Sequence, residues 1–137
     1  MEALIPYLNF DGNCREAMEY YARLFGLQLD LMTFADMPGD QPPHLQSRIL
    51  HACLTKSGQP LLMASDTLAG EVSANTTWLN VVCESRDEIE RLFAELGAGG
   101  SVQMPLHDAF WGARFGMLTD RYGVRWMFNY ETKGAAA

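Results

Sequence analysis

The sequence predicts an α+β fold built from two tandem βαβββ modules, and three observations support this prediction. The order of one strand, one helix and three further strands occurs twice along the 137 residues, at an offset of about 71 or 72. A helix-capping motif stands at the same place in both halves, at Asn13 and at Ser85. Each predicted helix then ends on a glycine, Gly26 or Gly97. Because residue identity between the halves is low, the repeat is one of pattern.

The first module is predicted to begin with a strand and a helix. Side chains alternate between two faces from Leu4 to Phe10, which is typical of a strand. After a turn at Asp11 and Gly12, apolar residues recur at helical spacing from about Asn13 to Phe25. Asn13 and Glu16 have the spacing of a capping box, so we expect Asn13 to cap this helix.

Three further strands are predicted to complete the first module. A strand over Leu27–Phe34 is followed by a loop over Ala35–Gln46 that contains three prolines. The segments Arg48–Thr55 and Gln59–Ser65 then flank Ser57 and Gly58, which predicts a hairpin.

The second module repeats this order. A strand is predicted over Thr76–Cys83, and Ser85 with Glu88 forms a second capping box before an apolar stripe that ends at Gly97. The remaining strands are predicted over Ser101–Leu106, Gly112–Thr119 and Val124–Tyr130, with a turn at residues 120–123. We expect a single domain of two modules, at about residues 3–66 and 76–131, and a flexible tail at residues 132–137.

Composition predicts one soluble globular domain. Apolar residues make up 48% of the chain and charged residues 20%, and a chain of this length buries enough surface to need no disulfide. The net charge of −7 argues against nucleic acid or an anionic membrane as the partner. With no membrane-spanning apolar run and no secretory pattern at the start, we expect a cytoplasmic protein. Cys14, Cys53 and Cys83 form no CxxC pair and are expected to be reduced.

The predicted architecture also suggests where a ligand binds. One short helix cannot cover both faces of a four-stranded sheet, so helices on the outer faces leave the inner faces to curve around a shared or separate hollow. Eight methionines are more than usual for this length, and their flexible side chains suit an adaptable apolar wall. We therefore expect a small molecule to bind there.

Four separated blocks of sequence resemble a known family: PYLNF with GNCREA, LMASD, FWG with RFG, and DRYGV with WMFN. Together with the tandem βαβββ order, they are similar to the PhnB-like branch of the vicinal oxygen chelate superfamily, which includes glyoxalase I, extradiol dioxygenases and bleomycin and fosfomycin resistance proteins. The resemblance spans nearly the whole chain. Some members carry a ubiquinone methyltransferase label. We expect no such activity, because this sequence lacks a doubly wound nucleotide-binding sheet and a glycine-rich loop after a strand.

The same resemblance implies four inward strand positions that hold a metal ion in the superfamily enzymes, usually with His and Glu. Here these positions fall on Ile5 or Pro6, Met63, Thr77 or Trp78, and Met127. Methionine suits copper(I) far better than a divalent ion, and the other residues are poor ligands. Independently of the family, His44, His51 and His107 lie in three separate segments. We therefore expect no metal site and no cofactor.

A mixture of aromatic, apolar and amide residues forms the candidate ligand site, because strand alternation groups them by face. The set is Tyr7, Asn9, His51, Met63, Ser65, Trp78, Asn80, Trp111, Phe115, Met127 and Asn129. Buried amides need partners, which a ligand could supply, whereas the alternative is that these are ordinary core residues. Cys53 shares a predicted strand face with His51, but this spacing fixes no attack geometry, so no catalytic residue is assigned.

The first functional hypothesis is a metal-independent protein that binds a small molecule. The resemblance also implies a homodimer in which the partner completes the open side of each sheet. The alternative is a lyase, isomerase or dioxygenase that holds its metal with unusual ligands, such as His51 with Asp66 or Glu84. A third hypothesis is a purely structural or regulatory dimer with a filled interior.

Overall fold

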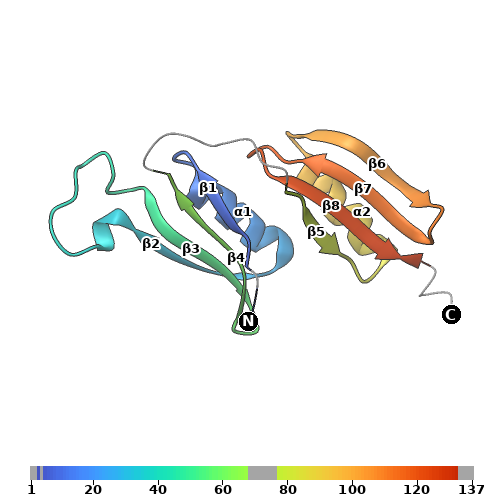
Figure 1. Cartoon of the computed structure of the whole chain (residues 1–137), viewed down its shortest axis with the longest axis horizontal. Helices are drawn as coiled ribbons and strands as arrows, with labels where there is room; N and C mark the ends of the chain where they lie inside the picture. Colours follow the sequence, from blue (N-terminus) through green and yellow to red (C-terminus); the bar gives the residue numbers. More distant parts are fainter. Residues whose placement is uncertain (1–2, 4, 68–76, 133–137) are drawn as a thin grey trace. The chain divides into compact units, whose positions relative to one another are not determined.

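The computed structural model describes residues 3, 5–67 and 77–132, and the chain divides into two compact units, residues 1–74 and 75–137 (Figure 1). Each unit contains one α-helix and one four-stranded mixed sheet. The predicted α+β fold of two βαβββ modules is therefore confirmed. The predicted strand starts at Leu4 and Thr76, and residues 133–137 of the predicted tail, lie outside the described residues.

The first unit follows the element order predicted from the sequence. Its elements are β1 (Tyr7–Phe10), α1 (Cys14–Phe25), β2 (Gln28–Thr33), a short 3-10 helix η1 (Phe34–Asp36), β3 (Ile49–Lys56) and β4 (Gln59–Asp66). The sheet order is β1-β4-β3-β2, in which β1 runs parallel to β4 and the other neighbours are antiparallel. Ser57 and Gly58 join β3 to β4 with positive φ angles of 51° and 79°, as a two-residue hairpin turn requires.

Helix α1 packs on one face of this sheet, against β2, β3 and β4. The residues that it buries recur every three or four positions: Cys14, Ala17, Met18, Tyr21 and Leu24. The helix ends at Gly26, whose φ of 66° is left-handed and whose N–H donates to the carbonyl of Ala22.

The start of α1 is held by Asp66 and not by Asn13. Asn13 makes no side-chain capping bond. Instead, Oδ1 of Asp66 accepts hydrogen bonds from the backbone N–H groups of Gly12 at 2.8 Å and Cys14 at 3.1 Å, and Oδ2 accepts from the N–H of Ile49 at 2.9 Å. The predicted capping box at Asn13 is therefore wrong. A buried carboxylate 52 residues away from Cys14 in sequence already satisfies the donors that a local cap would serve.

We expect the substitution Asp66→Asn to lower the free energy of unfolding by about 1–3 kcal/mol, because an amide nitrogen would then face a buried N–H donor. The Asp66 residue is only 4% exposed, so water cannot replace the lost bond. Urea denaturation followed by circular dichroism measures this loss. Asp40→Asn, at an exposed loop carboxylate, is the matched control and should change stability by less than ~0.5 kcal/mol. Equal losses in the two variants would contradict the role given to Asp66.

The second unit has the same order of elements without the 3-10 helix. They are β5 (Leu79–Val82), α2 (Arg86–Gly97), β6 (Ser101–Ala109), β7 (Ala113–Thr119) and β8 (Arg125–Glu131). The sheet order is β5-β8-β7-β6, with β5 parallel to β8 and the other neighbours antiparallel. Strand β6 runs past its predicted end at Leu106, and its register shifts twice between Val102 and His107.

Helix α2 is capped as predicted. The hydroxyl of Ser85 accepts a hydrogen bond from the N–H of Glu88 at 3.1 Å. The Glu88 carboxylate reaches one residue further back than a standard capping box and accepts from the N–H of Glu84 at 2.9 Å. The helix ends at Gly97, as expected.

A second buried carboxylate, Asp120, shapes the turn between β7 and β8. Its Oδ1 accepts hydrogen bonds from the N–H groups of Tyr122 at 2.8 Å and Val124 at 3.0 Å. Its Oδ2 accepts from the indole nitrogen of Trp126 at 2.8 Å. The carboxylate thus fixes the turn and holds a core tryptophan at the same time.

Both described α-helices contain twelve residues, and no described helix is long and apolar enough to span a bilayer.

Candidate functional site

Each sheet has one face covered by its helix and one face turned away from it (Figure 1). Successive residues of a strand point to opposite faces, so the buried Ala52, Leu54 and Ala64 mark the helix side of the first sheet. We call the other side the first open face, comprising Tyr7, Asn9, Met32, His51, Cys53, Met63 and Ser65. The second open face includes Asn80, Val82, Met104, His107, Phe115, Met117, Met127 and Asn129, and Trp78 extends it just before β5, in contact with Arg125.

Ten of the eleven residues in the predicted site lie on these two open faces. On the first, Tyr7 is the cross-strand partner of Met63, and Asn9 is the partner of Ser65. The remaining predicted residue, Trp111, follows β6 and stacks beside the second open face. The predicted grouping by face thus agrees with the strand register, while ligand binding stays a prediction.

Tyr7 and His51 are joined on the first open face. The Tyr7 hydroxyl lies 3.1 Å from Nδ1 of His51, and the two ring centroids are 5.8 Å apart. Tyr7 is 47% exposed and His51 is half-buried, so this pair is accessible to a bound molecule. Because Tyr7 engages Nδ1, the second ring nitrogen, Nε2, is the one placed to meet a ligand.

On the second open face, amides and apolar side chains alternate between neighbouring strands. Asn80 is the cross-strand partner of Met127, and Phe115 is the partner of Asn129. At one end, the guanidinium of Arg125 lies 3.9 Å from the centroid of the Trp78 ring, a cation–π contact.

Aromatic rings gather at the turn between β6 and β7. The Trp111 ring lies 5.6 Å from Phe115 and 5.2 Å from Phe110, both nearly edge-on. Phe110 is 98% exposed and Trp111 is 50% exposed. An apolar edge of this kind, next to the second open face, is accessible to a planar ligand or to another protein.

The open faces also hold Met32, Met104 and Met117, which the sequence-based prediction of the site did not include. Met104, Met117 and Met127 are successive cross-strand partners on β6, β7 and β8. On the first sheet, Met32 is the partner of His51. The high methionine count of the sequence was a signal for such an apolar surface. Only the strand register shows which methionines are cross-strand neighbours.

The residues at the superfamily's metal positions do not fit a divalent ion. Met63 and Met127 lie on the open faces and offer thioether sulfur, a donor that suits soft monovalent ions. Among the described residues, no three His, Cys, Asp or Glu side chains lie close enough to share a metal ion.

The alternative ligand pair of His51 with Asp66 is wrong. Asp66 is buried on the helix side of its sheet, and both of its oxygens accept backbone hydrogen bonds. His51 lies on the opposite face, because strand alternation puts it with Cys53 and not with Ala52. Glu84, the other proposed partner, lies between β5 and α2 and is exposed, and its pairing with His51 stays a prediction.

The three cysteines are free, as expected. Burial raises the pKa of Cys14 to about 12, and burial likewise raises that of Cys83 to about 12. For the half-buried Cys53, loss of solvent and then the nearby Asp30 carboxylate raise the thiol pKa above its usual 9.0. At neutral pH Cys53 is therefore a protonated thiol and a weak nucleophile.

We expect alkylation of Cys53 by iodoacetamide to be slow at pH 7 and to keep accelerating at pH 9. Thiolate is the reacting form, so the rate rises about tenfold per pH unit as long as the pH is below the thiol pKa. Mass spectrometry of labelled peptides measures the rate, with the buried Cys14 and Cys83 as unreactive internal controls. A plateau below pH 9 would mean that the Cys53 pKa is not raised.

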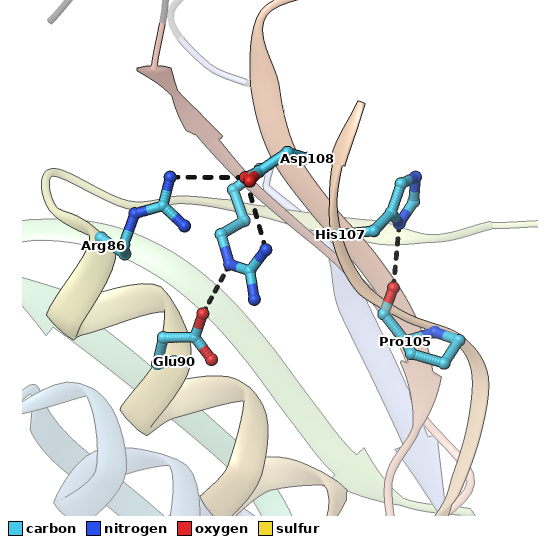
Figure 2. A network of polar contacts seen from close by, with 6 residues as sticks. Arg86, Glu90, Pro105, His107 and Asp108 are labelled. Carbon is cyan, nitrogen blue, oxygen red and sulfur yellow. Dashed lines mark hydrogen bonds and ion pairs between the residues drawn. The ribbon is translucent and has the colours of Figure 1, made fainter. Parts of the chain in front are cut away.

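A surface network connects α2 to β6 and β7 on the helix side of the second sheet. Its members are Arg86, Glu90, Asp108 and Arg114. Figure 2 shows the Asp108 side chain directed at guanidinium groups, whereas the His107 side chain turns away and its Nδ1 lies 2.9 Å from the Pro105 carbonyl oxygen. The two adjacent side chains diverge, so they do not form a shared metal site.

Two βαβββ units with one open face each define the fold of the glyoxalase/bleomycin resistance/dioxygenase proteins. A family enzyme of this class from Burkholderia phytofirmans PsJN is similar with a TM-score of 0.64 and 15% identity, over 94% of this chain and 99% of that chain. Identity this low shows the fold alone.

Within that class, the sequence matches the 3-demethylubiquinone-9 3-methyltransferase family over residues 2–128, and the chain belongs to this PhnB-like family. Protein PA1353 from Pseudomonas aeruginosa is 42% identical with a TM-score of 0.84, over 96% of this chain and 98% of that chain. The PhnB protein from Bacillus cereus is 30% identical with a TM-score of 0.74, over 94% and 99%. Protein YjdN from Escherichia coli K12 is 33% identical over 137 residues, covering 92% of this chain and 93% of its own.

Proposed function

We propose that this chain binds a small, mostly apolar molecule on the open faces of its sheets, without the divalent ion of the superfamily enzymes. The observation that carries the proposal is the composition of these faces. Aromatic, thioether and amide side chains lie together there and remain partly exposed. This mixture is typical of small-molecule sites, in which apolar contact supplies affinity and a few polar groups fix orientation.

The second open face provides the clearest set of contacts. Met127 and Phe115 present apolar surface, and a methionine side chain adapts its shape to different partners. Asn80 and Asn129, next to them across the strands, present amide donors and acceptors. A ligand with a flat apolar body and a polar edge fits this order of groups.

Methyl transfer, the activity in the family's name, is not part of the proposal. In each sheet only one strand pair is parallel, and one helix packs on one face. A nucleotide-binding sheet is instead mostly parallel, with a glycine-rich turn from its first strand into a helix. Membership of the family therefore supports the fold of this chain and its relation to the similar proteins. The proposed function is binding and does not include methyl transfer.

The proposal includes a homodimer in the cytoplasm. Val82, at the edge strand β5, is 69% exposed, and apolar side chains at a sheet edge favour association with a second copy. Three unpaired cysteines support a reducing compartment.

We expect the fluorescent probe 8-anilinonaphthalene-1-sulfonate to bind saturably, and Met127→Ala to weaken this binding about tenfold. Burying a methionine side chain contributes ~1.5–3 kcal/mol, and about 1.4 kcal/mol corresponds to a factor of ten in Kd. Fluorescence titration measures Kd. Met37→Ala removes an exposed thioether from a loop and is the matched control. If both variants bind like the unmodified chain, or if no saturable binding occurs, the open-face proposal fails.

A separate measurement addresses methyl transfer. A ligand present at 100 times its Kd stabilises a protein by about 2.7 kcal/mol. We expect millimolar S-adenosylmethionine to leave the thermal midpoint of this chain unchanged. A saturable rise of the midpoint with concentration would restore the methyltransferase interpretation.

A further inference from the structure

Four side chains with soft or borderline donor atoms lie next to one another on the first open face. They come from three adjacent strands: Met32 from β2, His51 and Cys53 from β3, and Met63 from β4. Met32 is the cross-strand partner of His51, and Cys53 is the partner of Met63. His51 and Cys53 are two residues apart on one strand and point to the same side.

These positions bring the donors within reach of one ion. Cross-strand partners have Cβ atoms about 4.5–5.5 Å apart, and alternate residues of one strand are roughly 6.6 Å apart. The donor sulfur of methionine lies two bonds beyond Cβ on a flexible side chain, so Met32 and Met63 can lean over the central pair from the two flanking strands. The four residues are half-buried or exposed, which leaves the donors accessible from solvent.

Their chemistry selects the ion. Two thioethers, one thiol and one imidazole form a soft set that suits copper(I), whereas zinc and the harder divalent ions prefer imidazole, thiolate and carboxylate clusters. Only two members of the set are of the His, Cys, Asp or Glu type, and among the described residues no three side chains of those types form a group that could hold a metal ion by themselves.

We propose that Met32, His51, Cys53 and Met63 form a binding site for copper(I) on the first open face. On binding, the Cys53 thiol releases its proton to solvent and the sulfur forms the bond to the ion, with no change of oxidation state. The Asp30 carboxylate, the cross-strand partner of Cys53, adds negative charge beside the cation.

Tyr7 is the positioning residue of this site. Its hydroxyl meets Nδ1 of His51 at 3.1 Å, so the ring is oriented with Nε2 as the coordinating nitrogen. In the liganded tautomer, Nδ1–H donates to the Tyr7 oxygen. A partner of this kind on the second ring nitrogen is a regular feature of metal-binding histidines.

The second sheet offers a natural comparison. Its row of Met104, Met117 and Met127 contains thioethers only. The cysteine of that unit, Cys83, is buried. If thioethers on a sheet face were sufficient to bind copper(I), this row would bind it as well as the mixed set does.

The test is competition for copper(I) between the full chain and bicinchoninate in the absence of oxygen, followed by the colour of the copper–bicinchoninate complex. We expect one equivalent of copper(I) to move to the protein. Cys53→Ser and Met63→Leu should each weaken binding by more than about 100-fold, and Tyr7→Phe by about 10-fold or more, the range for a residue that orients a ligand. Met117→Leu, the matched control on the second sheet, should bind like the unmodified chain.

X-ray absorption on the copper-loaded chain should show sulfur together with one imidazole nitrogen, a readout that a merely structural role of these residues would not produce. Unchanged thermal midpoints of the metal-free variants ensure that the losses are local. The proposal is overturned if no copper(I) leaves bicinchoninate, if Met117→Leu loses as much affinity as Met63→Leu, or if the bound ion has only nitrogen and oxygen neighbours. None of these results bears on binding of the apolar probe through Met127, so the two proposals fail independently.

Discussion

The structure depends on one geometric constraint: a single helix of twelve residues covers only one face of a four-stranded sheet. The buried residues of each unit therefore collect between helix and sheet, and the alternation of strand side chains assigns every second residue to a face that no element of the same unit covers. Polar, thioether and aromatic groups collect on those faces because partial exposure is compatible with them, whereas the helix side buries mainly Ala, Leu, Ile and Phe.

Two buried carboxylates accept hydrogen bonds from N–H groups that are buried or partly buried in the two units. Asp66 connects the start of α1 to β3 and β4, and Asp120 closes the turn from β7 to β8 while it holds Trp126. Each accepts at least three hydrogen bonds, so burial of the carboxylate is compensated by direct donors. The two residues have different local roles, because Asp66 binds N–H groups at a helix start and Asp120 binds those of a hairpin turn.

Most of the fold was predictable because its signals are local. Helical spacing, the Ser85 cap and the Ser57–Gly58 turn each depend on a few neighbouring residues, and the structure agrees with them. The Asn13 cap failed because its competitor, Asp66, is distant in sequence and contributes only after the sheet has formed. Strand β6 exceeded its predicted length because two register shifts remove the alternation that marks a strand.

The candidate site was likewise predictable where its signals are local and not where they depend on residues distant in sequence. Alternation was sufficient to group Tyr7 with Asn9 and Met127 with Asn129, because both members of each pair lie on one strand. The neighbours across strands, such as Met32 beside His51 or Met117 between Met104 and Met127, follow from register. Register depends on turns and bulges, which the alternation of residues along the sequence does not reveal.

Pro105 has a further consequence for the behaviour of this chain in concentrated solution. Strand β6 forms one border of the second sheet, and a long border strand with unpaired backbone groups is a template on which further chains can stack into fibrils. Proline has no N–H to donate, and the irregular backbone around it interrupts the regular spacing that such stacking needs. Pro105, which lies inside the strand predicted over Ser101–Leu106, thus disfavours backbone pairing of a second chain along this edge.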